Sequence, residues 1–145
     1  MRSVNFFPDR RQNVDESSRR EQGMAVRRAI LGDAHVDASI VRGTAFTEEF
    51  QDLITRYAWG EIWTRPGLAT NTRSLITMAM LIALGRDDEF EMHVRASAAA
   101  GVTREELKEL LLQSAIYCGV PAANNAFRLA ERAFATMDAA SGTSG

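Results

Sequence analysis

The sequence predicts an all-α protein, a compact domain of about six or seven helices. No run of alternating β-branched residues is long enough to build a sheet. Apolar residues instead recur at steps of three and four, which is the period of an amphipathic helix. Thr103 and Glu106 have the spacing of a capping box, a pattern that starts helices. The 145 residues fit one domain whose core needs no disulfide or structural metal.

Helical periodicity runs from residue 23 to about residue 138, and this range is the predicted domain. Residues 1–22 are polar, mixed in charge and without a helical period, so we expect a flexible N-terminal arm. Residues 139–145 are expected to form a flexible tail. Within the domain, a short helix over 24–31 ends at Gly32, and a second short helix follows, for which Asp33 is available as a cap.

The first long amphipathic helix is predicted to start at Phe46. Its apolar stripe consists of Phe46, Phe50, Leu53, Ile54, Tyr57, Ala58 and Ile62. We expect it to break within residues 59–68, because Pro66 and Gly67 stop a helix. Two tryptophans and Arg65 lie close together in this segment. They indicate either an aromatic plug between helices or a pocket wall in which Arg65 meets an anion.

The helix predicted over residues 72–84 is apolar on every side, so we expect it to be buried all round at the centre of the core. Gly85 ends this helix, and Asp87 or Asp88 can cap the next one. The capping box then starts a helix that runs to about residue 118. A last helix, with a seam of small residues over 123–137 that allows close approach to its neighbours, completes the chain.

Glu89 and His93 are the strongest candidates for chemistry. They lie four residues apart on one helical face, where a carboxylate can set the tautomer of the imidazole and raise its pKa. Two interpretations stay open for His93, a catalytic group or a core histidine with an acidic neighbour. His35 lies in a joint between helices, where capping or a backbone hydrogen bond explains it more simply.

Composition excludes several classes of function. The net charge of −2, with both signs scattered, disfavours binding of nucleic acid or of an anionic membrane. The apolar run 75–84 is about half of the ~20 residues that span a bilayer. A single cysteine, Cys118, excludes an internal disulfide and suits a reducing compartment such as the cytoplasm; we interpret it as a packing residue. Two histidines are too few for a metal site, and none is expected.

Three runs of the sequence, 23–40, 49–68 and 72–127, resemble the carboxymuconolactone decarboxylase family, which has an alkylhydroperoxidase-D-like fold. Its sister branch, the alkylhydroperoxidase-D disulfide reductases, has a CxxC followed four residues later by a histidine. The corresponding cysteine positions are Arg86 and Glu89 here, while His93 is present. Thiol-disulfide chemistry needs two exchangeable sulfurs, so this chain cannot share that activity.

The resemblance implies a cofactor-independent decarboxylase that acts on a small lactone bearing two carboxylates, in the protocatechuate branch of aromatic degradation. It also implies a homo-oligomer, most simply a hexamer. On this basis six residues have expected roles: His93 with Glu89 behind it as donor or acid, Arg65 and Arg73 as carboxylate anchors, and Trp63 and Tyr57 as walls for the ring. Two alternatives are a non-catalytic or sensing member of the same fold and a decarboxylase of a related acid in biosynthesis.

Overall fold

The computed structural model describes residues 15–142, which form seven α-helices, one π-helical segment and no strand, as the all-α prediction requires. The elements in chain order are α1 (Glu16–Leu31), α2 (Asp33–Val41), α3 (Glu48–Ile54), η1 (Thr55–Ile62), α4 (Thr70–Ala83), α5 (Asp87–Arg95), α6 (Arg104–Tyr117) and α7 (Val120–Gly142). None of these helices has the length and apolar character needed to cross a membrane.

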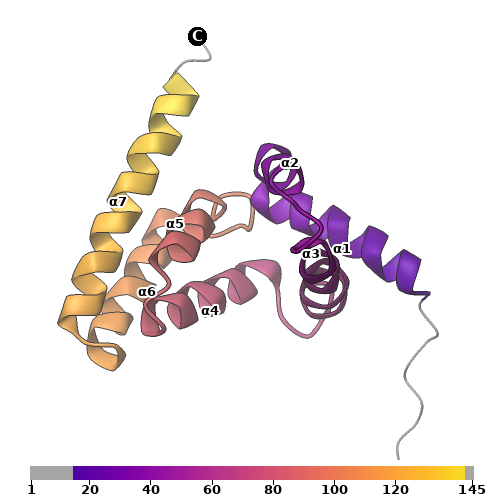
Figure 1. Ribbon diagram of the computed structural model, residues 1–145. Helices are drawn as coiled ribbons and strands as arrows, with labels where there is room; N and C mark the ends of the chain where they lie inside the picture. Colours follow the sequence, from indigo (N-terminus) through magenta and orange to yellow (C-terminus); the bar gives the residue numbers. More distant parts are fainter. Residues whose placement is uncertain (1–14, 143–145) are drawn as a thin grey trace, which may run out of the picture.

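The helices form two halves (Figure 1). In the N-terminal half, α1 lies along η1, while α2 packs on α1. In the C-terminal half, α4, α5 and α6 pack together and α7 covers them from one side. The main core lies in the C-terminal half, around Met78, Phe90, Leu107 and Leu111. A smaller cluster of Ile30, Trp59 and Ala100 joins α1 and η1 to the connection between α5 and α6.

Two glycines bring α1 and η1 into backbone contact. A Cβ atom at Gly23 would lie 2.0 Å from the carbonyl oxygen of Thr55, and one at Gly60 would lie 2.5 Å from that of Arg19. Only a residue without a side chain fits at either position. The helix predicted over residues 24–31 is the second half of α1, which begins earlier, at Glu16. Its first two turns form because they also pack against η1.

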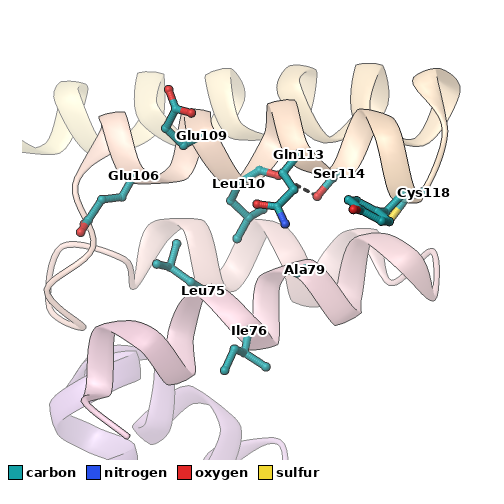
Figure 2. Close-up of a pocket in the computed structure, with 10 residues that line it drawn as sticks. Leu75, Ile76, Ala79, Glu106, Glu109, Leu110, Gln113, Ser114 and Cys118 are labelled. Carbon is teal, nitrogen blue, oxygen red and sulfur yellow. Dashed lines mark hydrogen bonds between the residues drawn. The ribbon is translucent and has the colours of Figure 1, made fainter.

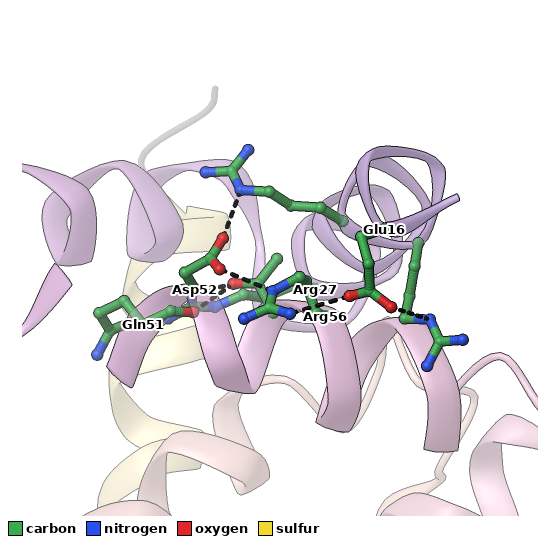
Figure 3. A network of polar contacts seen from close by, with 8 residues as sticks. Glu16, Arg27, Gln51, Asp52 and Arg56 are labelled. Atoms are coloured by element: carbon green, nitrogen blue, oxygen red, sulfur yellow. Dashed lines mark hydrogen bonds and ion pairs between the residues drawn. The ribbon is translucent and has the colours of Figure 1, made fainter. Parts of the chain in front are cut away.

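Ion pairs hold the early turns of α1 in place (Figure 3). Arg56 of η1 donates to Glu16 at 2.9 Å and to Asp52 at 2.7 Å, and Arg20 donates to Asp52 at 2.8 Å. Residues 16–22, expected to belong to a flexible arm, are therefore helical. Residues 1–14 of that arm lie outside the described residues, as do residues 143–145 of the expected tail. Residues 139–142 of the tail continue α7.

The long helix breaks after Ile62, within the predicted range of residues 59–68. After α3 the chain widens into η1, which carries the helical path through Trp59 to Ile62. The hydroxyl of Thr55 donates to the carbonyl of Gln51 at 2.8 Å, and such a bond competes with the regular backbone ladder. Pro66 and Gly67 then fall in the turns before α4, where the sequence predicts that no helix continues.

The central helix α4 is not buried all round, contrary to the sequence prediction. Ser74, Met78 and Ile82 are buried, whereas Met80 is 59% and Leu84 is 72% exposed. The reason is that α5, α6 and α7 all pack on the same side of α4. One apolar face of α4 is therefore left uncovered within a single chain.

The local signals at helix ends were only partly predictive. The capping box is confirmed, since the backbone N–H of Glu106 donates to the hydroxyl of Thr103 at 3.1 Å. The small-residue seam is also confirmed, and its buried members are Ala123, Ala126, Ala130 and Ala133.

The predicted aspartate caps are wrong. Asp87 accepts instead from the Asn125 side chain at 3.0 Å, and Asp33 accepts from Arg28 at 3.0 Å.

Candidate functional site

His93 lies where the two halves of the molecule meet. It is carried by α5, it is only 7% exposed, and its Nδ1 atom is buried without a hydrogen-bond partner among residues 15–142. The indole of Trp63 stacks on its imidazole with 6.4 Å between ring centroids and 13° between the planes. Trp63 in turn stacks on Trp59 at 5.1 Å. The structure thus joins two predicted site residues, Trp63 and His93, that are thirty positions apart in the sequence.

The expected hydrogen bond between the Glu89 carboxylate and the His93 imidazole is not formed among the described residues. The Glu89 side chain is exposed. The expectation of a raised pKa is also wrong, because burial, and then the charge of His35, lower the pKa of His93 from its ordinary value of 6.5. Removal from water disfavours the imidazolium form of His93 in the free protein.

His35, which the sequence favoured as a structural residue of a joint, belongs to a basic cluster beside this site. It lies half-buried on α2, and burial together with the charges of Arg27, Arg42 and Arg95 lowers its pKa. Its own charge acts on His93, so the two histidines are close enough to interact. No local pattern in the sequence predicts this basic cluster, because its residues come from α1, α2 and α5.

Arg27 is a further residue that sequence analysis missed. Only 6% of it is exposed, and its guanidinium donates to Gln51 Oε1 at 3.0 Å and to the hydroxyls of Thr55 and Ser39 at 3.3 Å each. Its Nε atom is buried and has no acceptor. Burial, followed by the charge of Arg28, lowers the pKa of Arg27. The sequence shows Arg27 only as one arginine among many, since burial of a charge leaves no periodic signal.

The two expected carboxylate anchors lie on the chain just after Trp63. Arg73 is half-buried, its Nη2 donates to the carbonyl oxygen of Arg65 at 3.1 Å, and its Nε is buried without an acceptor. The Arg65 side chain is exposed. Arg73 therefore keeps unused donor capacity close to the turn that carries Trp63.

Tyr57 lies in different surroundings from those expected. Its ring lies 5.3 Å from the guanidinium carbons of both Arg19 and Arg56, against the ion pairs that fix α1. The structure does not bring this ring into stacking contact with Trp63 or His93, although all three residues are described.

Two cavities lie between the helices, and His93 lines neither of them. One, of about 490 Å³, lies between α4 and α6 and is mainly apolar (Figure 2). Cys118 lies at its edge and packs against the main core, as expected for a packing residue. The other, of about 610 Å³, lies between α1, α2 and α3, with Arg27 in its wall. Among residues 15–142 no cluster of histidine, cysteine and acidic side chains is suited to a metal ion.

Comparison with known proteins adds independent evidence. Residues 48–132 match the Carboxymuconolactone decarboxylase family. A protein named 4-carboxymuconolactone decarboxylase from Acinetobacter baylyi is 49% identical over 83% of this chain and 90% of its own length. Nitrosuccinic acid decarboxylase npaB of Metarhizium robertsii is 37% identical over 85% of this chain and 87% of its own length.

A third relative, also named 4-carboxymuconolactone decarboxylase, comes from Pseudomonas putida. It is 52% identical over 48 residues, which is 33% of this chain and all of the relative. The matches to the first two relatives extend over most of both chains, and the family match includes η1 and α4 to α6 together with His93. The chain therefore belongs to the carboxymuconolactone decarboxylase family.

Proposed function

We infer that the protein is a carboxy-lyase that converts 4-carboxymuconolactone to the 3-oxoadipate enol-lactone and CO2, in the protocatechuate branch of aromatic degradation. The observation that carries this inference is the 49% identity, over 83% of this chain and 90% of the relative, to a protein named 4-carboxymuconolactone decarboxylase. The substrate is a small lactone with two carboxylates. The environment of His93, which combines the indole of Trp63 with a neighbouring histidine, His35, that is itself close to arginines, is compatible with such a ligand.

The chemistry needs no cofactor. When the bond between the ring carbon and the departing carboxylate breaks, its electron pair flows through the ring double bond to the lactone carbonyl and forms a dienolate. A proton is then added to carbon, and the double bond ends in its new position. The protein must stabilise charge on the carbonyl oxygen, keep the departing carboxylate poorly solvated, and deliver one proton.

His93 is the group proposed to stabilise the dienolate oxygen and to deliver the proton. Burial lowers the pKa of His93 in the free protein, but a bound dianion favours the imidazolium and raises the pKa of a neighbouring histidine. Binding of the dianionic substrate thus favours the protonated form of His93, which burial alone disfavours. The indoles of Trp63 and Trp59 provide surroundings that solvate a departing carboxylate poorly.

The remaining expected residues take supporting roles in this proposal. Arg65 and Arg73 attract the incoming dianion, and Arg73 is the better placed because its Nε has no acceptor within residues 15–142. Glu89 acts as a second acid–base group one helical turn from His93, without a direct hydrogen bond in the free chain. Tyr57 contributes to the substrate site only from behind the Arg19 and Arg56 side chains that lie against it.

We further propose that the chain works as a cytoplasmic homo-oligomer, most simply a hexamer. The support is the amount of apolar surface that one chain leaves uncovered, which includes Phe46 at 96% and Met80 at 59% exposure. Patches of this kind mark interaction surfaces. Light scattering of the purified protein tests the assembly, and a stable monomer at micromolar concentration contradicts it.

The activity is tested by incubating the purified, metal-free protein with 4-carboxymuconolactone. Carbon dioxide is measured in the headspace and the enol-lactone is followed by proton NMR. Equal amounts of both products, formed in proportion to enzyme concentration, are the expected result. A protein that folds and assembles but releases no CO2 above the buffer rate refutes the proposal and favours a sensing member of the fold.

One relative supports a second candidate, decarboxylation of a related small acid in biosynthesis. The match to nitrosuccinic acid decarboxylase extends over 85% of this chain at 37% identity. Nitrosuccinic acid is also a small acid with two carboxylates, and loss of CO2 next to a nitro group likewise leaves a delocalised anion. A competition assay with both acids at equal concentration decides between the substrates through their ratio of kcat/KM.

A further inference from the structure

Arg27 is a buried cation whose hydrogen-bond partners are all neutral. Its acceptors are the hydroxyls of Thr55 and Ser39 and the amide oxygen of Gln51. No carboxylate within residues 15–142 forms an ion pair with it. Its neighbour Arg28 is half-exposed and pairs with two aspartates, at 3.0 and 2.8 Å. The more deeply buried of two adjacent arginines is thus the one without a counter-ion.

This arrangement is unfavourable in an empty site. A buried charge without an opposite charge has a large desolvation cost, and neutral acceptors compensate only part of it. The Nε atom of Arg27 adds a buried donor with no acceptor. An anion that reached the remaining donors of this guanidinium, on Nε and Nη1, would therefore gain a charge-assisted hydrogen bond.

The cavity of about 610 Å³ gives an anion access to Arg27. Gln51, Thr55 and Ser39 form the polar part of its wall around the guanidinium, while Met24 and Ile40 supply an apolar part. The volume lies in the range typical of small-molecule sites. A wall with one cationic end and an aliphatic side matches a small organic acid better than an inorganic anion.

Two carboxylates also line this cavity, and their positions limit their effect on Arg27. Asp52 is held by Arg20 and Arg56, at 2.8 and 2.7 Å, and its pKa is lowered by these two arginines. Glu48 is exposed to solvent. Neither forms an ion pair with Arg27, so its charge is left for a ligand.

We propose that Arg27 is a carboxylate-binding residue and that the cavity between α1, α2 and α3 receives a small organic acid, whose carboxylate pairs with this guanidinium. The identity of the acid rests on the proposed function: it is the lactone substrate, and the carboxylate held by Arg27 is the one that the product keeps. After burial, the charge of Arg27 lowers the pKa of His35, and the charge of His35 lowers the pKa of His93.

The test is isothermal titration of the assembled protein with 5-oxotetrahydrofuran-2-acetic acid, a saturated lactone acid that cannot lose CO2 by the proposed route. Its methyl ester is the uncharged control ligand, and succinate is a second acid of different shape. The variants are Arg27→Gln and the matched control Arg28→Gln on the same helix. We expect the wild type to bind the acid but not the ester, and Arg27→Gln to lose about 30-fold or more in affinity. Arg28→Gln should stay within about 3-fold, because its charge is already paired.

A second variant protects the test against misfolding. Arg27→Lys keeps the positive charge and should fold even if glutamine is not tolerated; we expect a loss of about tenfold, because an ammonium has three donors where a guanidinium has five. The proposal is overturned if Arg27→Gln binds the acid within about 3-fold of wild type, or if wild type binds neither lactone acid nor succinate at millimolar concentration. Binding through Arg27 without CO2 release from carboxymuconolactone rejects the proposed function and leaves the carboxylate site standing.

Discussion

Replacement of His93 by glutamine tests the proposed chemistry most directly. Glutamine keeps the approximate size and one N–H donor, but it cannot take up and deliver a proton. A positioned acid typically contributes ~10²–10⁴-fold to a rate, which corresponds to about 3–5 kcal/mol in the activation free energy. Because the imidazole is 93% buried and stacks on Trp63, no solvent-borne acid can readily reach the same position. We therefore expect kcat to fall by about 10²-fold or more, with KM changed far less.

The assay is initial-rate release of CO2 at pH 7 over a range of lactone concentrations, with circular dichroism and light scattering to confirm fold and assembly. Lys108→Gln is a suitable control, since this exposed lysine on α6 pairs only with Glu105 in the described structure. It should leave kcat within about twofold. If His93→Gln folds, assembles and turns over within a few-fold of wild type, His93 is a core residue. The proton donor must then be sought among the other groups of the basic cluster.

Four further predictions follow from the same structure. Glu89→Gln should lower kcat by less than about tenfold, because the exposed carboxylate makes no direct bond to His93; a loss as large as that of His93→Gln contradicts this. Cys118→Ala should keep turnover near wild type, which rate assays under reducing and oxidising conditions check. Gly23→Ala, whose methyl would lie 2.0 Å from a backbone oxygen, should lower unfolding free energy by roughly 2–4 kcal/mol in urea titrations, and Gly142→Ala, with open space, should not. Finally, because the pKa of His93 is lowered in the folded protein, the unfolded chain binds more protons than the folded chain. The contribution of His93 to the free energy of unfolding is therefore present above pH 6.5 and is lost as the pH falls below it. His93→Gln should weaken this loss of stability at low pH.

The parts of the fold that the sequence predicts are those fixed by neighbouring residues. The capping box at Thr103 and Glu106 lies within one turn, so its outcome depends on little else. The face of α4 that carries Met80 is different, because its exposure depends on which side α5 and α6 occupy. A continuous apolar pattern indicates that all faces of a helix avoid water. It does not indicate whether the same chain or another copy covers them.

The candidate site shows the same difference between features that neighbouring residues determine and features that depend on how helices pack. The sequence identifies His93 and Trp63 individually, but their stacking depends on how η1 packs against α5. The expected pairing of Glu89 with His93 used spacing alone, and a shared helical face permits contact without enforcing it. Arg27 could not be predicted, because its importance comes from burial without a counter-ion, a property of three helices together.

The position of the site between two halves links packing to catalysis. His93 comes from α5, whereas Trp63 follows η1 and Arg27 belongs to α1, so their relative geometry depends on how the N-terminal half is built. The backbone contacts at Gly23 and Gly60 fix α1 against η1, and thereby fix Arg27 relative to Trp63. Since reacting groups must be held within fractions of an ångström, a shift of α1 along η1 would misplace the substrate while leaving every proposed catalytic residue present. A change at Gly23 should therefore reduce kcat even in conditions where the protein remains folded.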